Sequence, residues 1–165
     1  MTTIAYRDGV MAGDSSFTFN DVVDTLSRKV HRLKSGALLG QAGDNDGRHL
    51  VALLDGARTA KQLPSRADLL GLRANFVGLL VLPRGAVFKI NGALKPPEHW
   101  SEKDDGQDVG IWPIEAPFAA IGSGTDLALG ALAHGASALQ AVKIACRFDI
   151  HSRPPVYSLA LAKGR

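Results

Sequence analysis

The sequence is poor in the features that mark secreted, membrane and disulfide-bonded proteins. One cysteine, Cys146, in 165 residues permits no internal disulfide and favours a reducing compartment. The longest apolar runs, 76–83 and 116–121, are much shorter than a membrane span. The chain does not open with a basic segment followed by an apolar one, so we expect no signal peptide. These absences predict a cytoplasmic protein with no membrane partner.

An excess of charge of one sign is also lacking. The chain has 19 Lys and Arg against 16 Asp and Glu, a net charge of +3, and the basic residues are scattered. This pattern argues against a nucleic-acid partner. The five histidines show no spacing typical of metal ligands, so we expect no metal. Cys146 lies in an Ala-rich helical pattern and is expected to be a small core residue rather than a nucleophile.

The order of the expected elements predicts an α+β protein in a single domain, residues 1–165. Strands come in hairpins instead of alternating singly with helices, which favours antiparallel sheets with helices on the outside. The polar stretch 96–108 is expected to be an exposed loop. The expected strands cover 2–7, 10–15, 29–33, 37–42, 76–82, 86–91, 118–121 and 156–162. The expected helices run from a cap at 44 or 45 to 57, and over 66–73, 126–134 and 138–147.

The start of the chain, Met1-Thr2-Thr3-Ile4, suggests a nucleophile. Methionine before a small residue is normally removed, which would leave Thr2 with a free α-amine beside its own hydroxyl. An α-amine has a pKa of about 7.7–8.0 and can accept the hydroxyl proton near neutral pH. Because Met-Thr starts are common, an ordinary chain start is the alternative.

Five short segments, in a shared order, give the chain a resemblance to a known family. They are Thr2-Thr3-Ile4, Ala12-Gly13-Asp14-Ser15, Arg28-Lys29-Val30, Gln41-Ala42-Gly43-Asp44 and Ile121-Gly122-Ser123-Gly124. With these segments the chain resembles proteasome β-type subunits. Within that superfamily it most resembles the bacterial ATP-dependent heat-shock protease subunit. The resemblance reaches from residue 2 to about residue 150.

The resemblance implies a threonine-type peptidase with the N-terminal nucleophile hydrolase fold, a four-layer αββα sandwich of two antiparallel sheets flanked by helices. Thr2 would attack a peptide carbonyl. The charge of Lys29 would lower the pKa of the α-amine, and Asp14 would pair with Lys29. The backbone N–H of Gly43 would stabilise the oxyanion. An ordinary ion pair and a plain turn glycine are the alternatives for these positions.

Further site positions follow from the same resemblance. Ser123 matches a serine that supports the α-amine by hydrogen bonding, and its alternative is a helix N-cap. Asp149 and Ser152 have the spacing of an aspartate and a serine near the family's threonine, although Arg153-Pro154-Pro155 replaces the glycines that usually follow. The pocket for the residue before the cut is expected to include Phe17, Ser27 and Gln41.

The chain departs from the family between Gly47 and Phe76, where 28 residues stand in place of roughly twice as many. One of two long helices is therefore expected to be a stub. The resemblance implies a peptide or unfolded-protein substrate, a homo-oligomeric ring, a possible ring ATPase unfoldase as partner, and no cofactor. Two alternatives stay open: a catalytically silent structural or assembly subunit, and a small-molecule amidohydrolase on the same fold.

Overall fold

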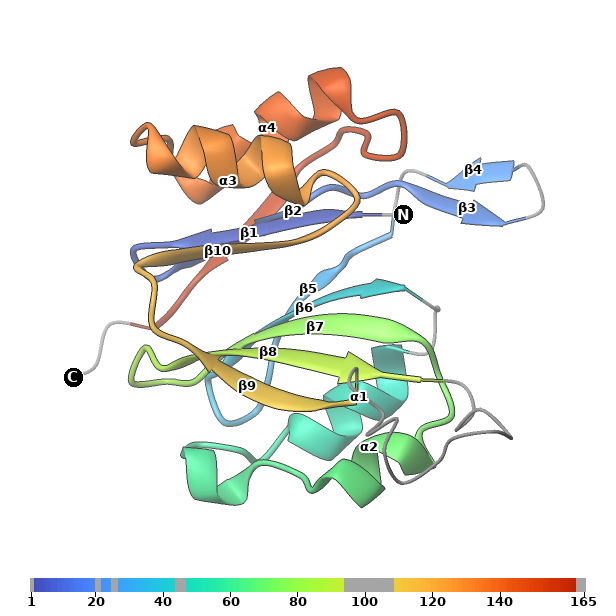
Figure 1. Ribbon diagram of the computed structural model, residues 1–165, viewed down its shortest axis with the longest axis vertical. Coiled ribbons are helices and arrows are strands. Elements are labelled where there is room, and N and C mark those ends of the chain that lie inside the picture. Colours follow the sequence, from blue (N-terminus) through green and yellow to red (C-terminus); the bar gives the residue numbers. More distant parts are fainter. Residues whose placement is uncertain (1, 20–21, 25–26, 44–46, 94–108, 163–165) are drawn as a thin grey trace, which may run out of the picture.

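The computed structural model describes residues 2–19, 22–24, 27–43, 47–93 and 109–162, with the backbone alone for 17–19, 22–24, 47 and 48. The chain forms four layers, helices, sheet, sheet and helices (Figure 1). The strands are β1 Thr3–Arg7, β2 Val10–Gly13, β3 Phe17–Phe19, β4 Val22–Asp24, β5 Val30–Arg32, β6 Leu38–Gly43, β7 Phe76–Val81, β8 Val87–Gly92, β9 Gly110–Ile114, β10 Phe118–Gly122 and β11 Tyr157–Ala160. The helices are α1 Gly47–Leu54, α2 Arg66–Gly71, α3 Thr125–Ala133 and α4 Ala138–Phe148, with a 3-10 turn at Ala60–Gln62.

Both large sheets are antiparallel. The first has the strand order β10-β1-β2-β11, and the second has the order β5-β6-β7-β8-β9. Strands β3 and β4 form a separate hairpin that projects from the end of β2 (Figure 1). The predicted αββα sandwich of antiparallel sheets is therefore confirmed.

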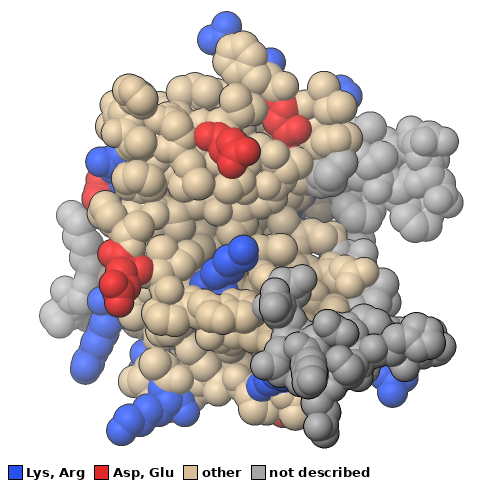
Figure 2. Space-filling view, viewed as in Figure 1, with Lys and Arg blue, Asp and Glu red and all other residues tan. Residues whose placement is uncertain are grey.

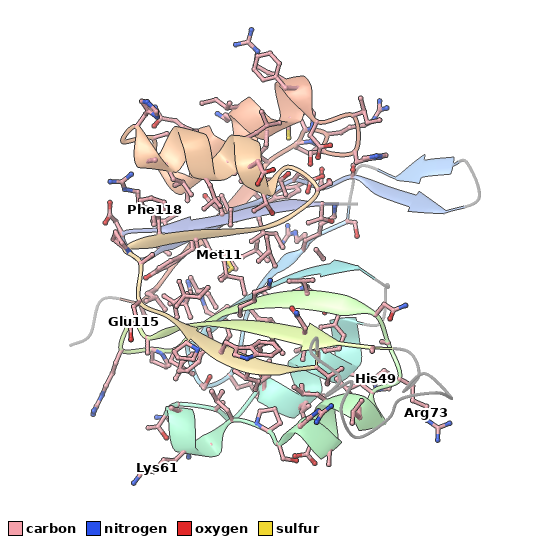
Figure 3. All side chains as sticks on the ribbon, in the orientation of Figure 1. Met11, His49, Lys61, Arg73, Glu115 and Phe118 are labelled. Carbon is pink, nitrogen blue, oxygen red and sulfur yellow. The ribbon has the colours of Figure 1, made fainter. Side chains whose placement is uncertain are left out.

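Three apolar clusters fill the spaces between the layers. Ile4, Met11 and Leu79 belong to the cluster between the two sheets, where Figure 3 shows Met11. Leu39 and Leu50 belong to the cluster between the second sheet and α1 and α2. The cluster under α3 and α4 is built largely from small residues. Small side chains allow these two helices to pack closely on the first sheet.

Most predicted elements are present, with two omissions and one overlong helix. The β3–β4 hairpin was not predicted. Strand β9 directly follows the expected loop, in a stretch to which no element was assigned. Within the described residues it is an edge strand paired with β8, and edge strands tolerate a residue such as Pro113. Helix α1 ends at Leu54, three residues before the predicted Ala57. The expected cap at 44 or 45 and the loop 96–108 lie outside the described residues.

The first helical layer is short, as predicted. Helix α1 has eight residues and α2 has six. Helix α2 is capped reciprocally, since Ser65 accepts from the Asp68 amide while the Asp68 carboxylate accepts from Ser65. This capping box stabilises a helix too short to persist alone.

Charged residues of both signs are scattered over the face seen in Figure 2, as the scattered basic residues of the sequence predict. Within the described residues, no helix is long and apolar enough to cross a lipid bilayer.

Two leucines of α3 provide a matched test of the packing. Leu132 is 0% exposed, whereas Leu127 is 37% exposed. We expect Leu132→Ala to lower the free energy of unfolding by about 2–5 kcal/mol, because it leaves a cavity, and Leu127→Ala to lower it by about 0.5 kcal/mol. Denaturant titration measures both. Equal losses would contradict the packing described.

His31, in β5, makes stability depend on pH. Burial lowers the pKa of its imidazole, so the unfolded chain takes up a proton at a higher pH than the folded chain. Stability should therefore fall as the pH drops below about 6.5 and stop falling below the folded-state pKa. We expect His31→Gln to weaken this dependence between pH 7 and pH 5, measured by thermal melting. An unchanged pH profile would exclude His31 as its source.

Candidate active site

Thr2 lies directly before β1 and is 4% exposed. Its carbonyl oxygen accepts a 2.7 Å hydrogen bond from the Ser123 amide. The next residue, Thr3, pairs with Gly122 in the β1–β10 ladder. The start of the chain is therefore held in the first sheet from residue 2 onward.

Gly122 is what allows this close approach of β10 to Thr2. It has a φ of +100°, and a Cβ atom there would lie 1.8 Å from the Thr2 carbonyl oxygen. Gly124 has a similar role, since its Cβ would lie 2.2 Å from Thr3 Oγ1. The glycines around Ser123 are therefore required by the packing of the first two threonines, a role not foreseen from the sequence.

Asp14 and Lys29 form a buried ion pair, as predicted. Lys29 Nζ donates to the two carboxylate oxygens of Asp14 at 3.1 and 3.2 Å. Asp14 is 1% exposed and Lys29 8% exposed. Burial lowers the pKa of the Lys29 ammonium, while the charge and hydrogen bonds of Asp14 act in the opposite direction.

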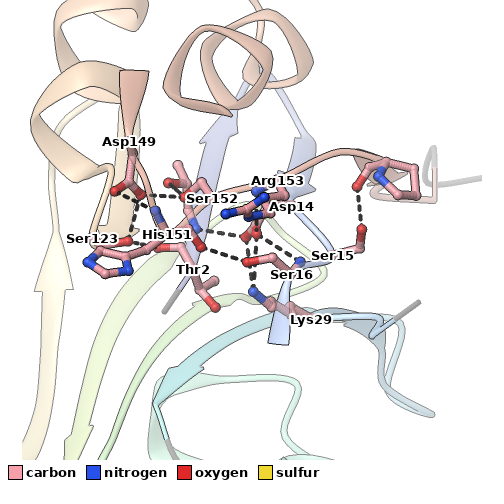
Figure 4. A network of polar contacts seen from close by, with 12 residues as sticks. Thr2, Asp14, Ser15, Ser16, Lys29, Ser123, Asp149, His151, Ser152 and Arg153 are labelled. Atoms are coloured by element: carbon pink, nitrogen blue, oxygen red, sulfur yellow. Dashed lines mark hydrogen bonds and ion pairs between the residues drawn. The ribbon is translucent and has the colours of Figure 1, made fainter. Parts of the chain in front are cut away.

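The pair lies directly beside residue 2. One of the two Asp14 oxygens that bind Lys29, Oδ1, also accepts a 2.8 Å hydrogen bond from the Thr3 amide. The Lys29 nitrogen and the Thr2–Thr3 peptide thus share one oxygen atom. Figure 4 shows the Thr2 side chain and the Lys29 ammonium directed into the same space.

Asp149, Ser152 and Ser123 form a second polar cluster. Ser152 and Ser123 donate to the same Asp149 oxygen at 2.5 and 2.7 Å. Burial opposes ionisation of Asp149, but these hydrogen bonds outweigh it, and its pKa is lowered. Ser152 Oγ is also 2.6 Å from Thr3 Oγ1. The structure therefore brings all three residues to the threonine pair (Figure 4).

The N-cap alternative for Ser123 is wrong. The N-cap of α3 is Gly124, and it makes no side-chain cap bond. The Ser123 hydroxyl instead points to Asp149 and, at 3.4 Å, to the Thr2 carbonyl. Ser123 thus connects Asp149 to residue 2.

Gly43 ends β6 and lines a pocket of about 560 Å³ together with Thr2. Its φ is +113°, and a Cβ would lie 2.4 Å from the Asn75 carbonyl oxygen. The glycine is therefore required by the chain entering β7, whatever its role toward a substrate. The helix expected to follow it directly begins at Gly47, and 44–46 lie outside the described residues.

The predicted substrate-pocket residues are not among those that line this pocket. Gln41 is 8% exposed and lies two residues before Gly43 in β6. Ser27 is half-buried and precedes Lys29. The backbone of Phe17 opens β3, and its side chain lies outside what the structure describes.

Several contacts in the site were missed at the sequence level because they use backbone groups. The amides of Ser16 and Arg153 both donate to the second Asp14 oxygen, at 3.0 and 3.3 Å. The Ser16 hydroxyl donates to the His151 carbonyl. No residue-type pattern signals a backbone donor, so only the fold reveals that Asp14 joins these segments.

Cys146 shows none of the features of a nucleophile. Burial raises the pKa of its thiol to about 11, so the thiol is protonated at neutral pH and reacts poorly. Among the described residues, no group of His, Cys, Asp and Glu has the arrangement of a metal site.

No protein-family model matches the sequence, and no curated protein matches it. Solved structures do match. BPH from Thiobacillus denitrificans has a TM-score of 0.64 at 19% identity over 99% of both chains. In its complex with epoxomicin the TM-score is 0.62 at 19% identity, over 98% of this chain and 99% of that one.

Eukaryotic HslV from Trypanosoma brucei has a TM-score of 0.66 at 18% identity, covering 96% of this chain and 98% of that one. The chain has the proteasome-like HslV fold. This similarity confirms the fold that the resemblance implied. The short helical layer of α1 and α2 does not change the fold.

The close contact between Gly122 and Thr2 can be tested by mutation, with a glycine of similar backbone conformation as the control. Gly36 has a φ of +90°, and a Cβ atom added there would have no neighbour within 4 Å. We expect Gly36→Ala to cost about 1–2 kcal/mol of stability from backbone strain alone. Gly122→Ala should cost about 1–3 kcal/mol more, because its Cβ collides with Thr2. Denaturant titration of both variants measures the difference, and equal costs would refute the close approach.

Proposed function

We propose that this protein is a threonine-type peptidase that uses Thr2 as its nucleophile after removal of Met1. The observation that supports this most is the position of the buried Asp14–Lys29 pair. Its shared oxygen accepts from the amide that follows Thr2, so a fixed positive charge lies next to the hydroxyl and the future α-amine.

In the proposed reaction, the Thr2 α-amine accepts the proton of Oγ1, and the oxygen attacks the carbonyl carbon of the substrate. The charge of Lys29 favours the unprotonated amine, because a like charge nearby lowers its pKa. The carbon–nitrogen bond then breaks, and the amine leaves with the proton. Water hydrolyses the remaining Thr2 ester and regenerates the hydroxyl.

Gly43 is the proposed oxyanion donor. It lines the same pocket as Thr2 and is exposed there, so a substrate carbonyl can reach its backbone. Pairing of β6 with β7 holds the Gly43 backbone in place, and a donor on a rigid backbone suits this role, since it does not reorganise as charge develops.

Ser123, Asp149 and Ser152 are proposed to position the terminus. Ser123 holds the Thr2 carbonyl through its amide, and Ser152 contacts the Thr3 hydroxyl. Together they fix the Thr2 carbonyl and the Thr3 side chain, which restrains the backbone that carries the α-amine and the Thr2 hydroxyl. Such preorganisation lowers the entropic part of the barrier.

We further propose that the substrate is a peptide or unfolded protein and that subunits assemble into a homo-oligomeric ring with a ring ATPase unfoldase as a possible partner. The HslV-like fold supports an assembly of this kind. One relative of the same fold has been solved with epoxomicin, which makes this compound a direct probe for the present site.

Replacement of the nucleophile tests the proposal. Thr2→Ala should abolish hydrolysis of fluorogenic peptides, and Thr2→Ser should retain part of it. Alanine and serine, like threonine, are small enough for Met1 removal, which intact-mass measurement checks. Unchanged melting curves would show that Thr2→Ala is folded.

Covalent labelling provides the second arm of the same test. A peptide vinyl sulphone should add its mass to the N-terminal peptide of the wild type and leave Thr2→Ala unmodified. Retained Met1 in active protein, or full activity of Thr2→Ala, would overturn the assignment. An inert protein with Met1 removed would instead favour a structural subunit.

A further inference from the structure

The pocket beside Thr2 is lined by strand ends of both sheets, and Ala42 and Gly43 of β6 are among its lining residues. It is lined by the start of β7 and the end of β8 on one side, and by Gly122 and Ser123 on the other. At about 560 Å³ it has room for a large side chain. It is therefore a candidate for one part of a bound peptide.

Alternation along β6 places the Ala42 wall of this pocket and the predicted pocket residue Gln41 on opposite faces of the second sheet. Ala42 belongs to the cluster between the sheets and lines the pocket. Its neighbour Gln41 must face the other side of the sheet. The residue opposite Gln41 is Gly78, whose Cβ would meet Leu50 of α1 and Ile90, so Gln41 faces the α1 layer.

A peptide lying across Thr2 thus meets two different surfaces on opposite faces of β6. The part before the cut is expected on the side of Ser27 and Gln41. The part after the cut must leave in the other direction from the Thr2 hydroxyl, where the pocket is. We propose, on the basis of the proposed function, that this pocket binds the first residue of the departing peptide and that Asn91 selects a carboxamide side chain there.

The composition of the lining supports an uncharged occupant. No Asp, Glu, Lys or Arg is among the lining residues of the pocket, which are mostly apolar or small. A charged side chain would lose its water here without gaining an ion pair. The preferred residue after the cut is therefore neutral.

Asn91 supplies the polar preference. Its Oδ1 atom is buried and has no hydrogen-bond partner in the part of the chain that the structure describes. Asn91 pairs with Val77 across the β7–β8 ladder, and both line the pocket. A buried acceptor without a partner is costly, and a substrate N–H would satisfy it.

Glutamine meets both requirements, because its carboxamide is neutral and donates two hydrogen bonds. Methionine has a similar length and shape but no donor, and glutamate has the shape but a charge. Asn91 would therefore determine specificity without taking part in the chemistry. The bond that breaks and the proton that moves are those of the proposed Thr2 reaction.

Internally quenched peptides that differ only in the residue after the cut test this inference. We expect kcat/KM to be about tenfold higher for glutamine than for methionine, the effect of one satisfied buried hydrogen bond, and lowest for glutamate. Asn91→Leu should reduce the glutamine-to-methionine ratio to about one. Lys89→Met, at an exposed position of the same strand, should leave the ratio unchanged.

Two controls separate the possible failures. The peptide vinyl sulphone occupies mainly the side before the cut, so Asn91→Leu should still be labelled at Thr2. A wild type that is neither labelled nor active would overturn the proposed function and this inference together. A labelled, active wild type with no glutamine preference, or an Asn91→Leu variant that keeps it, would overturn this inference alone.

If Asn91→Leu does not fold, the wild type still decides. Glutamine amide and methionine amide can be added as competing acceptors for the Thr2 ester, because an incoming amine uses the site of the departing one. Mass spectrometry should find the glutamine product in about tenfold excess. Equal products would refute the role of Asn91.

Discussion

The carboxylate of Asp14 is the interaction on which the arrangement of the site depends. It follows β2 in the first sheet and binds Lys29 at the start of β5 in the second sheet. Its two oxygens also accept from three backbone amides. A buried carboxylate needs such partners, because removing one member of a buried ion pair costs about 3–5 kcal/mol. The same contacts that make burial of the charge tolerable therefore hold residue 2 between the sheets.

The contacts of Thr3 also fix the position of its neighbour, Thr2. Its amide binds Asp14, its hydroxyl contacts Ser152, and its ladder partner is Gly122. The Thr2 carbonyl is in turn bound by Ser123. A chain terminus normally frays unless it is tied down, and here three separate segments tie it down. Positioning of the proposed nucleophile is thus a property of backbone contacts as much as of the charged pair.

Sequence reasoning located most elements, and several residues it named for the site lie close together in the structure, for reasons that are physical. Hairpin turns and apolar periodicity are local signals, so β1, β2, β7 and β8 were predictable. The role of Gly122 was not, because it depends on how close β10 passes to Thr2, which lies at the other end of the sequence. Strand β9 was missed because Pro113 and the preceding polar stretch are typical of a loop. The Asp149–Ser152 cluster came from the resemblance, and its contact with Thr3 came only from the fold.

In the proposed function, the face that each residue of β6 presents would let one strand serve both chemistry and selection. Gln41 faces α1, Ala42 faces the space between the sheets, and Gly43 ends the strand where the two faces meet. A carbonyl placed at Gly43 therefore has its two flanking residues on different surfaces. The helices α1 and α2 are short in this protein, whereas an apolar cluster fills the space between the sheets. The surface made by Ala42, Val77 and Asn91 is therefore supported by more of the fold than the surface on the α1 side. For the proposed peptidase, discrimination between peptides should then depend more on the departing side than on the acyl side.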